Sequence, residues 1–118
     1  MTFDLIRTTA LSLPHVTEGF PFDQSTLVFK VGGKMFLLID IDSPDAITLK
    51  SKPDQIPELL ESYDWISRGF HMNKNHWITL RLDSLKLDIT LVLKLITDSY
   101  SNVYQGLTKK AINAFENR

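Results

Sequence analysis

The histidines and one run of aspartates are the side chains of this sequence that could bind a metal. Asp40, Asp42 and Asp45 are spaced like the start of a calcium-binding loop, but the glycine and the distal glutamate of such a loop are missing from their positions. The histidines lack the spacing that places two imidazoles on one helix face: they are His15, His71 and His76. We therefore expect no metal site and interpret the aspartates as a solvated turn between strands.

Nucleophilic and phosphate-transfer chemistry lack their usual sequence patterns. The chain contains no cysteine, which excludes disulfides, thiolate metal sites and cysteine nucleophiles. There is no nucleophile-elbow motif, and Gly32-Gly33 lies between two apolar runs rather than before a helix, where a phosphate-binding glycine loop would lie. We predict a protein that is not an enzyme and that needs no cofactor.

Basic residues offer a different chemistry, which is contact with nucleic-acid phosphates. Lys30, Lys50 and Arg81 each fall within an expected strand, while Lys34 and Lys74 fall at the turns of two expected hairpins. Lysines at hairpin tips could reach backbone phosphates, and such contacts position a protein on DNA without identifying its bases. The alternative interpretation is that all five are solvated charges on sheet faces and turns.

Two further groups of residues have more than one interpretation. Lys109 and Lys110, with Arg118, lie near the C-terminus, where they would favour the carboxyl end of a helix or else contact an anion. Trp77 could stack on a base, although a tryptophan on a strand is more commonly part of the core. Phe36 and Trp77 could also contribute to a sheet face that accepts a protein or small-molecule partner.

The total charge argues against nucleic-acid binding. The 118 residues carry a formal net charge of −1, with 13 lysines and arginines against 14 aspartates and glutamates. Dedicated nucleic-acid binders usually carry a clear basic excess, because phosphate neutralisation supplies most of their affinity. DNA binding by this chain therefore requires that its basic residues gather on one surface.

The elements that must position these residues follow from hydrophobic periodicity and turn signals. Apolar residues at three-to-four spacing predict helices near both ends and a short one between, and alternating runs predict strands. The expected order begins with a helix that ends before Pro14, a loop over 14–21, strands flanking Gly32-Gly33 and a strand over 46–50. A short helix follows, which is entered at Pro53 or Pro57 and ends near 63, and then a hairpin over 66–82. The last element is a helix that is capped by Asp88, runs to 107 and continues less regularly to 115.

The first hairpin determines which side chains share a sheet face. If Val31 and Lys34 face each other across the glycines, one face carries Leu27, Phe29, Phe36 and Leu38, and the other carries Val28, Lys30, Met35, Leu37 and Ile39. Both faces would then be largely apolar. We expect the second face to be covered in part by a loop, another element or a partner.

This order of elements predicts a single α+β domain over residues 1–118, with an antiparallel sheet and helices packed mainly on one face. No apolar run approaches the roughly 18 residues that a membrane span needs. The N-terminus also lacks the basic start and apolar stretch of a signal peptide. We expect a soluble, cytoplasmic monomer that does not bind membranes.

Several segments together resemble the MmcQ/YjbR family. They are the opening helix that ends at Leu13-Pro14 with Glu18 soon after, then VFKVGGKMFLL, ITLK, HWITLRLD and ITDSYSNVYQGLTKK, in the family's order and over nearly the whole chain. The resemblance implies a YjbR-like fold similar to the bacterial frataxin-like (CyaY-like) domains. It also implies DNA binding through a double-wing motif, which is how the family is described.

Two functions are therefore open at the level of sequence. One is DNA binding with the hairpins as wings, in which phosphates would be contacted by Lys30, Lys34, Lys50, Lys74, Arg81, Lys109 and Lys110. The other is a non-catalytic module that accepts a protein or small molecule. The pair Ser99-Tyr100 also recurs in the family pattern, and here we expect Ser99 to bond back to a carbonyl of its own helix while Tyr100 joins the apolar stripe.

Overall fold

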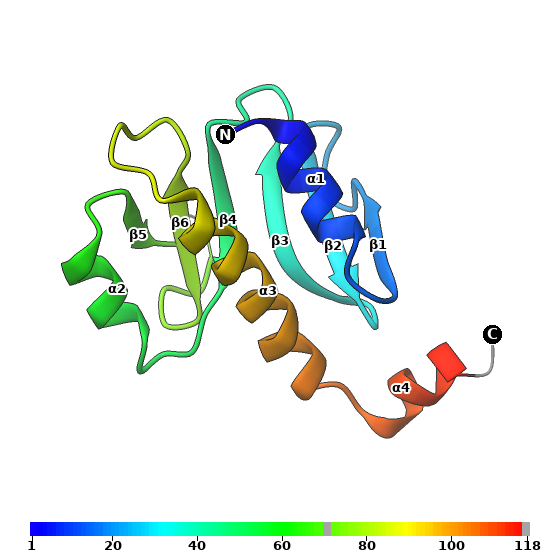
Figure 1. The fold of residues 1–118 in the computed structure, drawn as a ribbon. Coiled ribbons are helices and arrows are strands. Elements are labelled where there is room, and N and C mark those ends of the chain that lie inside the picture. The colour runs from blue at the N-terminus through cyan, green and yellow to red at the C-terminus, as the bar shows by residue number, and fades with distance from the viewer. Residues whose placement is uncertain (70–71, 117–118) are drawn as a thin grey trace.

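The computed structural model describes residues 1–69 and 72–116, which form one antiparallel sheet and helices (Figure 1). The described strands are β1 (Val16–Gly19), β2 (Thr26–Val31), β3 (Lys34–Asp40), β4 (Ala46–Lys50), β5 (Ile66–Arg68) and β6 (Trp77–Arg81). The described helices are α1 (Phe3–Leu11), α2 (Ile56–Ser62), α3 (Ile89–Gln105) and α4 (Lys109–Glu116). Across the sheet the strand order is β1-β2-β3-β4-β6-β5, and all neighbours are antiparallel.

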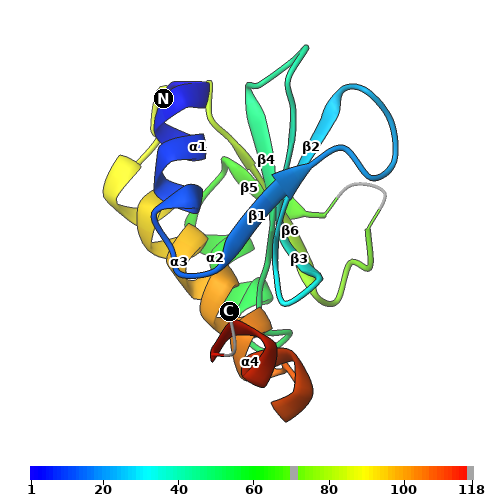
Figure 2. The same cartoon turned by 90° about the vertical axis from the view of Figure 1, so that its right-hand side faces the viewer.

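Helices α1, α2 and α3 cover one face of the sheet, as Figures 1 and 2 show. The long helix α3 packs across β2, β3 and β4, while α1 contacts β1 and α3, and α2 contacts β5. No described helix crosses the opposite face, which we call the open face. The predicted α+β class with helices on one face is confirmed.

Polar caps determine where the helices begin. The Thr2 hydroxyl accepts a hydrogen bond from the Leu5 N–H at the start of α1, and the Asp88 carboxylate accepts one from the Leu91 N–H at the start of α3. The predicted Asp88 cap is therefore confirmed. The expected continuation of this helix to residue 115 is wrong, because α3 ends before Gly106 and Thr108 caps a separate helix, α4.

The Gly32-Gly33 turn and the hairpin around it are confirmed, with φ angles of 58° and 78° that suit glycine. The predicted register beyond the turn is wrong, because Phe29 pairs with Leu37 whereas Lys30 pairs with Met35. Phe36 is thus an extra, bulged residue on β3. The bulge turns Leu37 and Ile39 into the core and Leu38 onto the open face, which makes that face less apolar than we expected.

The segment expected to be a loop over 14–21 contains the edge strand β1, so that prediction is wrong. The strand has no clear sequence signal, because it is short and half polar, with Thr17 and Glu18 at its centre. His15, at a φ of 63°, turns the chain into it. The second hairpin is confirmed in β5 and β6, and its residues 70–71 lie outside the described part of the chain.

The core lies between the sheet and its helices. Its largest fully buried side chains come from both layers: Ile6, Phe29, Phe36, Leu37, Ile39, Ile47, Leu49, Ile56, Ile78, Leu80 and Ile96. Burying apolar side chains of this size stabilises a fold by about 1.5–3 kcal/mol each. Among the described helices, none has the length and apolar character that crossing a membrane requires.

Candidate nucleic-acid interface

Lys30 and Lys50 both lie on the open face. Lys30 follows the core residue Phe29 on β2, so the alternation of the strand directs it away from the helices. Lys50 follows the core residue Leu49 on β4, and its Nζ lies 5.9 Å from the ring centroid of Trp77, its partner on β6. Only β3 separates the two lysine-bearing strands, which places their backbones about 10 Å apart.

Ser99 of α3 fixes the end of β4 at Lys50. Its fully buried hydroxyl accepts a hydrogen bond from the Lys50 N–H at 2.8 Å and donates one to the carbonyl oxygen of Phe36 at 2.6 Å. One hydroxyl thus satisfies backbone groups of two strands, including the bulged residue. Our expectation that Ser99 bonds within its own helix is wrong, because its acceptor lies 63 residues away.

Lys34 and Lys74 lie at the same end of the sheet as Lys30 and Lys50. Lys34 opens β3 directly after the glycine turn, and Lys74 belongs to the connection that leads into β6. Because neighbouring strands are antiparallel, β2 and β4 end where β3 and β6 begin. We call this group of four lysines, Lys30, Lys34, Lys50 and Lys74, the basic end.

Among the residues that the structure describes, no carboxylate pairs with a lysine of the basic end. The ion pairs found within residues 1–69 and 72–116 are formed by other cations, namely Arg7, Arg81, Lys86 and Lys94. Lys34 and Lys74 are exposed, and Lys30 and Lys50 are half-buried. Their ammonium charges are therefore available to an external anion.

Arg81, in contrast, lies at the opposite end of the sheet. It pairs with Ala46 across β4 and β6, and its guanidinium contacts Asp83 at 3.1 Å and Asp45 at 3.8 Å. The hydrogen bond and charge of Asp83, followed by the charge of Asp45, raise the pKa of Arg81. The structure therefore does not bring Arg81 together with the lysines.

Acidic residues gather at the end where Arg81 lies. They are carried by the loop before β2, the end of β3, the β3–β4 turn and the end of β6: Asp23, Asp40, Asp42, Asp45 and Asp83. A chain with a net charge of −1 thus has both a basic end and an acidic end. A chain with this charge can present a locally positive surface.

Lys109 and Lys110 occupy the first turn of α4 and not the carboxyl end of a helix. The electrostatic interpretation of these residues is therefore wrong, since the amino end of a helix is its positive end. Helix α4 lies against the first hairpin, where Ala111 and Ala114 share a small cavity with Gly32. The two lysines are exposed near the turn that precedes Lys34.

Phe36 and Trp77 differ in where they lie. Phe36 is fully buried in the core, with its ring nearly perpendicular to that of Tyr100 at a centroid distance of 5.5 Å, so it does not reach the open face. Trp77 is on the open face but only 7% exposed, close to Gly69 and Lys50. Stacking of Trp77 on a base would require that its neighbours move.

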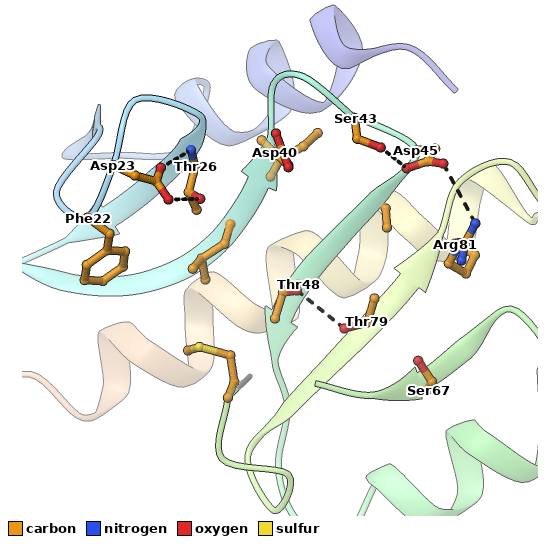
Figure 3. Close-up of a pocket in the computed structure, with 14 residues that line it drawn as sticks. Phe22, Asp23, Thr26, Asp40, Ser43, Asp45, Thr48, Ser67, Thr79 and Arg81 are labelled. Atoms are coloured by element: carbon orange, nitrogen blue, oxygen red, sulfur yellow. Dashed lines mark hydrogen bonds and ion pairs between the residues drawn. The ribbon is translucent and has the colours of Figure 1, made fainter. Parts of the chain in front are cut away.

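The acidic end of the open face holds a groove of about 800 Å³ (Figure 3). Its floor crosses β3, β4 and β6 through Leu38, Thr48 and Thr79, which are register neighbours, and the two threonine hydroxyls lie 3.4 Å apart. Phe22 lines one side and Arg81 the other. We call this the open-face groove.

The sequence pointed to Asp40, Asp45 and Arg81 for other roles and did not group them with Phe22, Thr48 and Thr79. The loop before β2 does carry a sequence signal. An aspartate that precedes a strand can accept hydrogen bonds from the backbone N–H groups two and three residues later, which is an Asx turn. Asp23 forms this turn with Ser25 and Thr26. The outward threonines could not be grouped without the strand order.

Metal-ligand geometry is absent from the described residues, in which no three His, Asp or Glu side chains converge. The aspartates of the β3–β4 turn instead bond locally: Asp40 accepts from the Asp42 N–H at 2.9 Å, and Asp45 accepts from the Ser43 hydroxyl at 3.2 Å. His71 lies outside the described part of the chain. His15 stacks on Phe115 at a centroid distance of 4.3 Å.

Comparison with known proteins decides the family. A family model described as YjbR matches residues 11–102. The chain belongs to the YjbR family. It is 38% identical over 102 residues to the uncharacterised protein YbdF of Escherichia coli O157:H7, covering 86% of this chain and 83% of that protein. It is 22% identical over 111 residues to the uncharacterised protein YjbR of Escherichia coli strain K12, covering 93% of each.

Two solved structures have the same fold as this YjbR-family chain. The Deinococcus radiodurans protein DR2400, with a DUF419 domain, superposes with a TM-score of 0.87 at 38% identity over 98% of this chain and 88% of that one. A Pseudomonas syringae protein superposes with a TM-score of 0.73 at 24% identity over 87% and 99% of the two chains. The YjbR match contains the whole basic end and ends before α4.

Proposed function

We propose that this YjbR-family protein binds double-stranded DNA through phosphate contacts made by the basic end. The observation that carries the proposal is the gathering of four lysines without carboxylate partners, within the described part of the chain, where β2, β3, β4 and the lead into β6 meet. Unpaired cations spaced across adjacent strands can each neutralise a phosphate and release its counterions.

Because charge is separated along the sheet, a chain with a net charge of −1 can still present a basic surface to DNA. The acidic residues lie at the other end of the strands, and β3 with its seven residues spans about 20 Å between the two ends. Exposed charges interact weakly beyond the Debye length, which is about 8 Å at physiological ionic strength. The phosphates would therefore experience mainly the lysines.

The contacts that we propose position the protein on DNA and do not identify bases. Trp77 is buried, and the hairpins of the double-wing description are built into one sheet, with the turn of β2–β3 and the connection into β6 at the same end. Lysine contacts to phosphates carry no sequence information. We accordingly propose binding without sequence preference, no catalysis, and a cytoplasmic monomer as the active form.

Fluorescence anisotropy with a labelled random-sequence duplex, measured over a range of salt concentrations, tests this proposal. Four phosphate contacts predict a slope of about −3.6 for the logarithm of the binding constant against the logarithm of salt concentration. In the Lys30→Ala/Lys50→Ala variant, loss of two contacts should bring the slope to about −1.8 and weaken binding at every salt concentration.

The matched control is Lys86→Ala/Lys94→Ala, which removes the same charge from lysines that pair with Asp64 and Asp98 away from the basic end. We expect the control to keep the wild-type slope. An equal loss of DNA affinity in both double variants would show that only the total charge of the protein matters. Absence of binding at low salt would overturn direct recognition of duplex DNA.

A further inference from the structure

The open-face groove is the second surface of this molecule that is arranged for binding. It lies toward the acidic end, and its lining includes Met72 from the connection that carries Lys74 but none of the four lysines of the basic end. A concavity of about 800 Å³ is in the range of sites for drug-sized ligands or short peptides. The groove is partly open to solvent, and such a shape would leave a small molecule partly solvated, whereas an extended segment can lie along it.

Phe22 gives the groove an apolar anchor point. Its side chain is 63% exposed, which is unusual for phenylalanine. The loop that carries it is held in place, because Asp23 accepts hydrogen bonds from the N–H groups of Ser25 and Thr26 and from the Thr26 hydroxyl. An exposed aromatic ring on a fixed loop loses little conformational freedom when a partner covers it.

The charges around the groove determine the sign of the charge that a partner should carry. Asp23, Asp40 and Asp45 line it together with Arg81, whose guanidinium already contacts Asp45 and Asp83. The backbone hydrogen bonds from Thr26 and Ser25 lower the pKa of Asp23, which keeps this carboxylate ionised. The groove is therefore complementary to a positively charged partner.

We propose that the open-face groove binds a short, extended basic peptide in which lysines or arginines alternate with large apolar residues. Successive side chains of an extended segment point to opposite sides. The apolar side chains would then lie against Phe22 and Leu38, while the cationic ones reach the carboxylates of Asp23 and Asp40. About six residues fill the available volume.

Labelled peptides of repeating Leu-Lys sequence provide the probe. We expect a fluorescein-labelled hexapeptide of alternating leucine and lysine to bind, with NMR shift changes at the backbone amides of Leu38 and Thr48. The same peptide with glutamate in place of lysine, and one with serine in place of leucine, should each bind about tenfold more weakly. Equal binding of the three peptides, shift changes confined to another surface, or no binding at about 1 mM would overturn the proposal.

Variants separate this site from the proposed DNA surface. Asp40→Asn keeps the acceptor for the Asp42 N–H but removes one charge, and Phe22→Ser removes the apolar anchor. Each variant should lower the affinity for the leucine-lysine peptide at least about threefold. Asp64→Asn is the matched control, since it removes one charge from outside the groove and should leave peptide binding unchanged. Lys30→Ala/Lys50→Ala should also bind the peptide normally, so failure of DNA binding and failure of peptide binding are distinguishable. Equal effects of Asp40→Asn and Asp64→Asn would overturn the assignment.

Discussion

Ser99 connects α3, β3 and β4 through one hydroxyl. Both of its backbone partners, the Phe36 carbonyl and the Lys50 N–H, lose their hydrogen bond in Ser99→Ala. A buried backbone group without a partner costs about 1–3 kcal/mol, so we expect this variant to lose about 2–4 kcal/mol of unfolding free energy. Urea denaturation measures the loss. Ser101→Ala, two residues along the same helix, is the control and should change stability by less than about 0.5 kcal/mol.

Tyr100 supplies a second long-range bond, from its hydroxyl to the carbonyl oxygen of Pro14 at 2.7 Å. Burial, followed by the neighbouring Tyr104, raises the pKa of Tyr100 above the ordinary tyrosine value of 10.0. Because the folded state has the higher pKa, the neutral phenol stabilises the fold fully below about pH 10. This stabilisation is lost as the pH rises through the folded-state pKa.

Tyr100→Phe should therefore be less stable than wild type by about 1 kcal/mol at neutral pH, and the difference should shrink above about pH 10. Thermal unfolding of both proteins at neutral and alkaline pH measures this. Tyr63→Phe, which removes a half-buried phenol from the end of α2, controls for general alkaline effects. A difference between Tyr100→Phe and wild type that stays constant with pH would contradict the raised pKa.

At the scale of elements, the β2–β3 turn shows how two adjacent glycines differ. Both have a positive φ, but a Cβ at Gly32 would lie 2.7 Å from Leu107 Cδ1, whereas one at Gly33 would meet nothing within 4 Å. We expect Gly33→Ala to cost about 1 kcal/mol from backbone strain alone, and Gly32→Ala to cost about 2 kcal/mol or more. Chemical denaturation of the two variants gives the comparison.

The cause of the extra cost can be separated from backbone strain. In a Leu107→Ala background the clash at Gly32 is removed, so Gly32→Ala and Gly33→Ala should then cost about the same, and a double-mutant cycle should give a coupling energy of about 1 kcal/mol. Zero coupling would mean that α4 and its lead-in do not press on the hairpin.

The same hairpin shows what the sequence could and could not predict. Local signals were sufficient for the glycine turn and for the Asp88 cap, because each depends on residues close in sequence. The register after Lys30 depends instead on the bulge at Phe36, whose carbonyl is held by Ser99 from a distant helix. The basic end likewise depends on strand order: Lys50 and Lys74 lie at the same end of the sheet as Lys30 only because β4 pairs with β3 and β6. Periodicity contains no such information.

At the scale of the whole molecule, the separation of charge should govern DNA binding more than the total does. Asp40→Asn/Asp42→Asn changes the formal net charge from −1 to +1 at the acidic end and leaves the lysines untouched. Because the two ends lie about 20 Å apart, we expect this variant to bind duplex DNA within about twofold of wild type at about 0.15 M salt.

Salt concentration then provides the decisive comparison. At about 0.01 M salt the Debye length reaches about 30 Å, which exceeds the distance between the ends, so the same Asp40→Asn/Asp42→Asn variant should bind DNA clearly more tightly than wild type. Lys30→Ala/Lys50→Ala should bind more weakly at both concentrations, since its lost charges would contact phosphates directly. Anisotropy titrations of the three proteins at both salt concentrations measure these differences. If the DNA affinities at about 0.15 M salt followed the net charge alone, the basic end would have no special role. At this salt concentration screening is strong, so distant charges should not affect a local contact.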